Sequence, residues 1–310
     1  MNAAAFPGLR TRFLALPDHR QGLAAVLLTA VLWSTGGLFI KWVDLDAVGV
    51  TMWRSLFAGI TMALLSGVGF ASLRRASRFE WTVAVSYAAM LFLFVLATKL
   101  TTAANAIFLQ YTAPLHIMLF GRWLLAERPT RLDVGCLIVA FGGMALFFVG
   151  RLEADDAAGN LCALGSGVGF ALFLTLLRRP ECRTETRPRA MVLGNALLAG
   201  TALVAVLARR DFAAFTPGPG DTAALLFLGV IQIGLAYVLF SYGIARIRVL
   251  EAALIGMLEP VLNPIWVFIV LDERPGWWAV AGGTVIVVAV VARTVASERR
   301  RAPIGAVAHA

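Results

Sequence analysis

A few polar and ionisable side chains within long apolar runs are the residues that could do chemistry. Glu259 and Asn263 are one helical turn apart and Trp266 follows at i+7, so a helix would present all three on one face. A carboxylate, an amide and an indole on one face can bind a small solute, and the carboxylate can also carry a proton. A structural reading stands beside this one, because Glu259 could simply satisfy backbone donors or pair with an arginine.

A second polar face is predicted from Asn105, Thr112 and His116, which follow one another at i, i+7 and i+11. Polar side chains are costly in hydrocarbon, so we expect this face to meet that of Glu259 across a central cavity. A lone histidine is also a common buried hydrogen-bonding residue, and that alternative stays open for His116. Further cavity walls are expected from Trp33, Ser34 and Tyr237, with Gln232 and Asn195; ordinary packing remains the alternative for the tryptophans.

Catalysis is not predicted, because an acid, base or nucleophile would need partners that the sequence lacks. The three histidines are His19, His116 and His309, and two of these lie near the ends of the chain. The three cysteines have unrelated spacings, and there is no HExxH or P-loop pattern. We therefore expect no enzymatic activity, no metal site and no cofactor.

The composition predicts an integral membrane protein. Of the 310 residues, 60% are hydrophobic and only 15% are charged, whereas soluble proteins have about 25% charged residues. Continuous apolar runs favour helices over barrel strands, because hydrocarbon offers the backbone no partner. We predict an all-α fold with ten spans, Gly22–Trp42, Val48–Phe70, Trp81–Thr98, Ala103–Leu125, Val134–Val149, Leu161–Leu177, Met191–Leu207, Ala223–Tyr242, Ala252–Leu271 and Trp277–Val295.

The basic residues predict the orientation of these spans. With the N-terminus inside, twenty of the 27 Lys and Arg residues fall in cytoplasmic segments and six fall outside. Both termini are therefore expected in the cytoplasm. The net charge of +9 then belongs to a face that lies against anionic lipid, so the lipid bilayer is the expected partner and nucleic acid is not. Arg54 is the basic residue that lies deepest within a span, close to its outer end, and we expect it to snorkel to the headgroups.

The chain contains an internal repeat. Pro114 and Pro260 are each followed, after twelve residues, by Glu-Arg-Pro, and residues 22–41 correspond to residues 159–178, with Trp33 opposite Phe170. A repeat of five helices is odd in number, so the second copy must be inverted. We predict a cytoplasmic N-terminal tail 1–21, a first five-helix repeat 22–150, an outer connection 151–158, a second repeat 159–296 and a cytoplasmic tail 297–310. Inverted repeats are typical of secondary transporters.

Short motifs in this order resemble a known family, the ten-helix EamA branch of the drug/metabolite transporter superfamily. They are Leu32-Trp33-Ser34-Thr35, Arg54, Leu258-Glu259-Pro260 and Asp272-Glu273-Arg274, and the resemblance covers roughly residues 22–295. It implies export of small metabolites, often amino acids, from a bacterial cytoplasm by alternating access. The Leu-Trp-Ser-Thr motif is also similar to the YddG-like aromatic amino acid exporters.

The charged residues expected in the cavity limit which net charge a substrate can have. Phosphorylated substrates would need several deep cations, whereas Arg54 alone lies more than one turn from the end of a span. We expect a neutral or zwitterionic solute, foremost an amino acid with an aromatic or apolar side chain. The alternative is efflux of lipophilic cations, favoured by a carboxylate near aromatic residues. Proton coupling and facilitated transport both stay open, and we expect a monomer.

Three prolines are expected to weaken their helices. Pro114, Pro260 and Pro264 each lack a backbone donor and leave a carbonyl free one turn earlier. Bends beside a central cavity would suit gating, and a static kink is the alternative.

Overall fold

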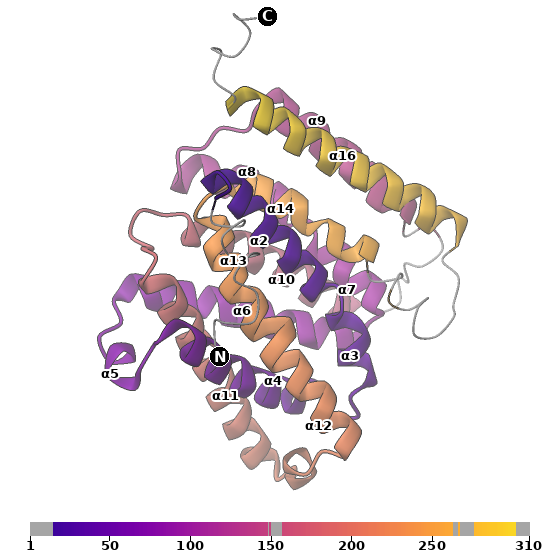
Figure 1. Cartoon of the computed structure of the whole chain (residues 1–310). Coiled ribbons are helices and arrows are strands. Elements are labelled where there is room, and N and C mark those ends of the chain that lie inside the picture. Colours follow the sequence, from indigo (N-terminus) through magenta and orange to yellow (C-terminus); the bar gives the residue numbers. More distant parts are fainter. Residues whose placement is uncertain (1–14, 148, 150–156, 263–265, 267–275, 302–310) are drawn as a thin grey trace, which may run out of the picture.

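Helices form every regular element in the described part of the chain (Figure 1). The structure is a computed structural model, and it describes residues 15–147, 149, 157–262, 266 and 276–301. The elements are α2 (Asp18–Trp33), α3 (Gly36–Trp42), α4 (Ala47–Ser66), α5 (Phe70–Leu73), α6 (Arg78–Leu100), α7 (Ala103–Gln110), α8 (Ala113–Leu124), α9 (Arg131–Phe147), α10 (Ala157–Leu177), α11 (Thr186–Arg209), the 3-10 helix η1 (Phe212–Phe215), α12 (Pro219–Leu226), the π-helix η2 (Phe227–Leu235), α13 (Ala236–Ile244), α14 (Val249–Gly256) and α16 (Trp277–Arg301).

Local sequence signals begin and end several of these helices. Ser77 and Glu80 form a capping box at the start of α6, and Asp46 accepts a hydrogen bond from the backbone of Gly49 at the start of α4. Gly67 ends α4 with a φ of 67°, a conformation that glycine adopts without strain. The spans therefore have defined ends at the predicted polar connections.

Within the described residues, seven helices are long and apolar enough to cross a membrane, namely Asp18–Trp42, Ala47–Ser66, Arg78–Leu100, Ala157–Leu177, Thr186–Arg209, Pro219–Ile244 and Trp277–Ser297. The other three predicted spans fall on shorter elements. One is divided into α7 and α8, one is the 17-residue α9, and the last begins with α14 and extends beyond the described residues. Large apolar side chains such as Leu64 and Ile138 are exposed on the surface, as expected beside lipid.

The helix packing has the same pattern when the two halves of the chain are exchanged. In the predicted repeats, α4 corresponds to α11 and α9 to α16, and each helix packs on its own counterpart. Figure 1 shows α9 and α16 side by side along one edge of the molecule. The first helix of each half packs on the third helix of the other, α2 on α13 and α10 on α6.

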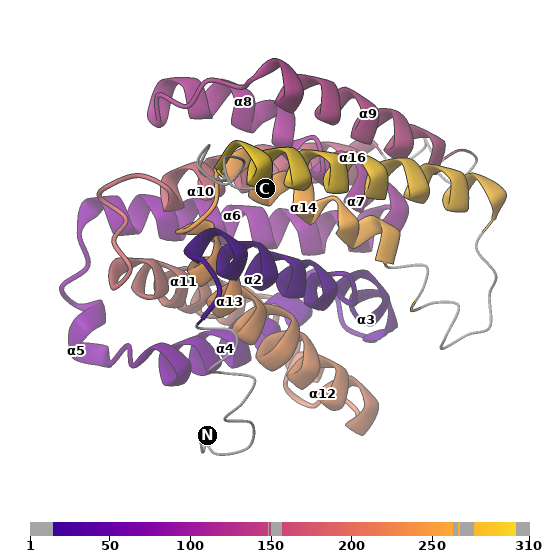
Figure 2. The same ribbon diagram turned by 45° about the horizontal axis from the view of Figure 1, so that its top comes forward.

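Connections predicted on the same side of the membrane contact one another. Asp46 and Arg209, from two connections expected outside, form an ion pair of 3.2 Å. Arg248 and Asp133, from two connections expected inside, form one of 3.1 Å. Figure 2 shows α2, α6 and α10 lying between α9 on one side and α4 on the other.

Candidate functional site

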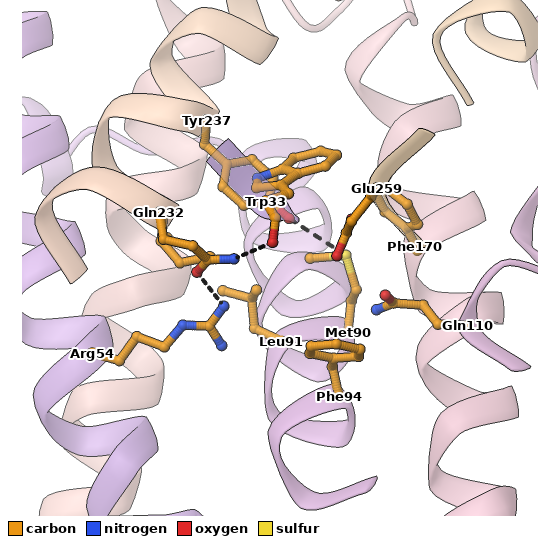
Figure 3. A pocket seen from close by; sticks show the side chains of 11 residues that line it. Trp33, Arg54, Met90, Leu91, Phe94, Gln110, Phe170, Gln232, Tyr237 and Glu259 are labelled. Carbon is orange, nitrogen blue, oxygen red and sulfur yellow. Dashed lines mark hydrogen bonds between the residues drawn. The ribbon is translucent and has the colours of Figure 1, made fainter. Parts of the chain in front are cut away.

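A small cavity of about 30 Å³ lies among the central helices. Ligand pockets in proteins have volumes of about 300–1,000 Å³, so this cavity would have to widen to hold a solute. Helices from both halves of the chain contribute to it (Figure 3). Its lining residues are Trp33, Arg54, Met90, Leu91, Phe94, Gln110, Phe170, Gln232, Ile233, Tyr237 and Glu259.

Arg54 provides the cation of the cavity. Its side chain is buried, with 4% of its surface exposed, and its Nη2 donates a hydrogen bond of 2.9 Å to Oε1 of Gln232. The prediction that Arg54 snorkels to the headgroups is therefore wrong. The side chain turns inward because α4 packs directly on η2, which places the Gln232 amide within reach of the guanidinium. A buried arginine needs such a partner, because its charge is costly in a dry environment.

Gln232 lies in the π-helix η2, in the middle of the segment 219–244. Its Nε2 donates to the backbone carbonyl of Trp33 at 3.3 Å, while its Oε1 accepts from Arg54, so both ends of the amide are fixed. Gly36 leaves room for this amide, since a Cβ there would lie 2.5 Å from Nε2 of Gln232. π-helical turns are rare and frequently mark functional sites.

Glu259 provides the anion of the cavity. It is 7% exposed, and its Oε2 accepts a hydrogen bond of 2.6 Å from the hydroxyl of Tyr111. Tyr111 lies between α7 and α8, where the helix is interrupted, so its side chain can reach across to the chain that follows α14. The predicted pairing of Glu259 with an arginine is not observed, because no Lys or Arg nitrogen of the described residues lies within 4.0 Å of its carboxylate.

Aromatic rings form one wall of the cavity. The Trp33 ring lies 5.7 Å from that of Phe170, its predicted repeat counterpart, and 4.9 Å from that of Tyr237. Phe94 faces the same space from α6. Aromatic pairs at such separations are favourable, and the flat faces can pack against an apolar or aromatic ligand. The indole Nε1 of Trp33 is buried without a hydrogen-bond partner among the described residues.

Trp33, Gln232, Tyr237 and Glu259 are thus the predicted site residues that line the cavity. Asn195, also predicted as a wall, instead donates to the hydroxyl of Tyr87 at 3.2 Å. Ser34 and Trp266 contact one another instead, with the indole Nε1 donating 2.7 Å to Oγ of Ser34. This hydrogen bond joins the end of α2 to the segment after α14. Asn263 lies outside the described residues.

Asn105, Thr112 and His116 lie apart from the cavity lining. Asn105 donates to Oδ1 of Asn160 at 2.9 Å, near the start of α10. Thr112 donates to the carbonyl of Leu109, and its own carbonyl is 3.0 Å from Nδ1 of His116. The expected common face assumed one straight helix, whereas α7 ends at Gln110 and α8 begins at Ala113.

Of the three prolines predicted to weaken their helices, Pro114 and Pro260 are described, and each follows an interruption of its helix. α7 ends four residues before Pro114, which lies in the first turn of α8. α14 ends at Gly256, four residues before Pro260, and residues 258–262 are again helical. The missing backbone donor explains both interruptions, because proline cannot bond to the carbonyl four residues earlier. Pro264 lies outside the described residues, and a role in gating stays a prediction for all three.

Several lining residues were not among those predicted for the site. The sequence analysis places Arg54 at the membrane surface, and nothing in the sequence alone distinguishes Gln110 or Met90 as a cavity residue. Tyr111 contacts the site through Glu259; a buried tyrosine three residues before a proline was the only available cue. Among the described residues, His, Cys, Asp and Glu do not gather in any group of three or more that could hold a metal ion.

Known proteins match this chain along nearly its whole length. The sequence pattern of the EamA-like transporter family matches residues 20–149 and 157–294. The uncharacterized transporter YcxC of Bacillus subtilis (strain 168) is 26% identical over 260 residues, 79% of this chain and 82% of YcxC. A probable terminal-alkyne amino-acid exporter of Streptantibioticus cattleyicolor is 26% identical over 268 residues, 84% of this chain and 88% of that protein. One solved crystal structure, 22% identical, has a similar fold, with a TM-score of 0.73 over 91% of this chain and 99% of that one.

Proposed function

The chain belongs to the EamA-like transporter family, and we propose that it exports small neutral or zwitterionic metabolites, foremost amino acids with aromatic or apolar side chains. It is a multi-span transporter of the bacterial cytoplasmic membrane and not an enzyme. The observation that carries the proposal is the cavity, which combines an aromatic wall with one buried cation and one buried anion.

The proposed topology has ten spans in two inverted five-helix repeats, 22–150 and 159–296, with both termini in the cytoplasm. The exchange pattern of helix contacts supports it, as do the two matched ranges of the family and the contacts between connections on each side. In this arrangement the cavity lies at the interface of the repeats, where substrates of such transporters bind. One chain then holds a complete pathway, which fits a monomer.

Alternating access would require the helices around the cavity to rock or bend. The interruptions before Pro114 and Pro260 are suited to this, because each lies beside the hydrogen bond between Tyr111 and Glu259. The two interrupted helices are repeat counterparts, so they can move in a matched way. Pro264 and Asn263 continue the same segment in the sequence and are proposed to contribute to it.

The substrate class follows from the lining of the cavity. Trp33, Phe170 and Tyr237 offer apolar and aromatic surface, and an amino-acid exporter is among the relatives. A second candidate is efflux of lipophilic cations, favoured by the position of Glu259 beside the same aromatic wall. Arg54 disfavours it, because a cation would bring a like charge into the cavity.

Purified protein in proteoliposomes tests the proposal through uptake of labelled phenylalanine, alanine and tetraphenylphosphonium, with and without a pH gradient. We expect saturable phenylalanine flux above that of protein-free vesicles. Flux that follows the gradient and is lost in Glu259→Gln would identify proton-coupled export. Flux that is the same with and without the pH gradient would identify a facilitator. Flux of tetraphenylphosphonium alone would contradict the amino acid proposal.

A further inference from the structure

Two opposite charges line one small cavity without forming an ion pair with each other. Arg54 and Glu259 both line the cavity, and Figure 3 shows their charged groups on opposite sides, pointing into it. Among the described residues, neither has a partner of opposite charge within 4.0 Å. Buried charges are usually paired, because an unpaired one loses its hydration without compensation.

Each charge has only neutral support, and that support is incomplete. Arg54 donates to the Gln232 amide, while its own Nε is buried and has no hydrogen-bond partner in the described part of the chain. Glu259 accepts from the neutral hydroxyl of Tyr111. Both side chains are thus held in place by neutral groups, and the two opposite charges act on each other only from beyond 4.0 Å.

We propose that the two residues together bind one zwitterionic amino acid, with Arg54 holding its carboxylate and Glu259 its ammonium group. This inference rests on the proposed function and assigns the poles of the substrate. The Arg54 guanidinium has a donor to spare, and a carboxylate accepts from guanidinium in a planar geometry. An ammonium group carries three donors and no acceptor, so it can donate hydrogen bonds to the carboxylate of Glu259 and compensate its charge.

The same geometry orients the side chain of the substrate. With its two charged groups between Arg54 and Glu259, the remaining surface of the cavity is the aromatic wall of Trp33, Phe170 and Tyr237. An apolar or aromatic side chain packs there. Gln232 acts as a positioning residue, because it fixes the guanidinium and is itself fixed by the Trp33 carbonyl.

The proposal makes the cavity selective for net-neutral ligands that carry both charges. A ligand with one charge leaves the opposite residue buried and uncompensated, which weakens binding. Phenethylamine lacks the carboxylate of phenylalanine, and hydrocinnamate lacks its ammonium group. We expect each to bind about 30-fold more weakly than phenylalanine, or worse.

Binding of these three ligands to the purified full-length protein, measured by calorimetry, tests the proposal. In the wild type, phenylalanine should bind most tightly. In Arg54→Gln the preference for phenylalanine over phenethylamine should disappear, and in Glu259→Gln the preference over hydrocinnamate should disappear. A purely structural effect would lower the affinity for all three ligands by the same factor, and that result would overturn the proposal.

The wild type alone also decides the matter if a variant does not fold. Equal affinity for phenylalanine and phenethylamine would overturn the assignment of Arg54, while leaving amino acid transport itself intact. If no amino acid bound to the protein or was transported by it, both the assignment and the proposed function would be overturned. Arg54→Lys, which keeps the charge, should retain part of the preference that Arg54→Gln loses.

Discussion

At the residue scale, the cavity depends on side chains whose roles come from partners far away in the chain. Arg54 and its acceptor Gln232 are separated by 178 positions, and Tyr111 and Glu259 by 148. Glu259 could be recognised from the sequence because a carboxylate in an apolar run is rare and costly. Arg54 was equally visible, but its direction depends on which helix α4 packs against, and one sequence does not contain that information.

Replacing Gln232 with glutamate tests the role of Arg54 in binding. In Gln232→Glu, a carboxylate would lie about 3 Å from the Arg54 guanidinium and form a permanent ion pair with it. We expect some loss of thermal stability, because a second carboxylate oxygen would face the Trp33 carbonyl that now accepts from Nε2 of Gln232. Phenylalanine affinity should fall about 30-fold or more, because the substrate carboxylate would meet a neutralised arginine. Calorimetry and thermal unfolding in detergent measure the two effects. Unchanged affinity would contradict the role given to Arg54.

At the element scale, the interruptions of the helices decide which side chains reach the cavity. The apolar runs predicted the existence and approximate bounds of the seven long helices found in the described residues, and the prolines predicted that two further helices are weakened. The break between α2 and α3 has no proline, and Ser34 and Thr35 there bond back to carbonyls of the preceding turn. Neither this break nor the π-helix η2 could be derived from periodicity, because both depend on packing between distant segments.

The close approach of α4 and η2 gives a direct test at Gly229. A Cβ at this position would lie 2.4 Å from Cβ of Phe57 and 2.9 Å from the carbonyl oxygen of Arg54. Gly229→Ala should therefore push η2 away from α4 and destabilise the protein by about 1–3 kcal/mol. Gly200→Ala is the matched control, because a Cβ there meets nothing within 4 Å, and alanine favours the helix. Thermal unfolding of both variants checks this; equal stability would contradict the packing.

An ionic network at the expected cytoplasmic end ties three elements together through Asp133. Its carboxylate is buried at the start of α9 and contacts Nε of Arg293 in α16 at 2.5 Å and Nη1 of Arg248, which precedes α14, at 3.1 Å. Burial raises the pKa of Asp133, but the backbone N–H of Thr130 and the charge of Arg293 outweigh it, so the pKa lies below its usual value.

Because the folded pKa is lowered, the stability that Asp133 contributes is present at neutral pH and is lost as the pH falls through the folded value. Asp133→Asn should destabilise the protein by about 3 kcal/mol at pH 7, since Arg293 would keep only the carboxylate of Glu251, 4.0 Å away. The difference in unfolding temperature between wild type and Asp133→Asn should narrow below about pH 4. A difference that is independent of pH would argue against an ionic role.

At the scale of the whole molecule, the central feature is the exchange symmetry of the two halves. The repeated Pro-to-Glu-Arg-Pro spacing predicted it, and the contacts of α2 with α13 and of α10 with α6 agree with it. Trp33 and Phe170, paired by the repeat alone, meet in the cavity. The sequence could not provide the cavity itself, because its lining comes from both halves at once.

The proposed topology predicts which connections face the cytoplasm. In a background with Cys136, Cys162 and Cys182 replaced by serine, Ala76→Cys should resist a membrane-impermeant maleimide in intact cells and react after permeabilisation. Thr216→Cys, in a connection expected outside, should react in both preparations. The reverse pattern would invert the topology, and labelling of both positions in intact cells would contradict the predicted number of spans between them.

Solute counterflow tests the central claim most directly, since it requires substrate to bind and cross through the protein without an imposed driving force. Proteoliposomes preloaded with unlabelled phenylalanine are diluted into labelled phenylalanine, with tetraphenylphosphonium counterflow as the comparison. The account predicts a transient overshoot of phenylalanine that is strongly reduced in Arg54→Gln. No overshoot with phenylalanine, together with one for the cation, would contradict it.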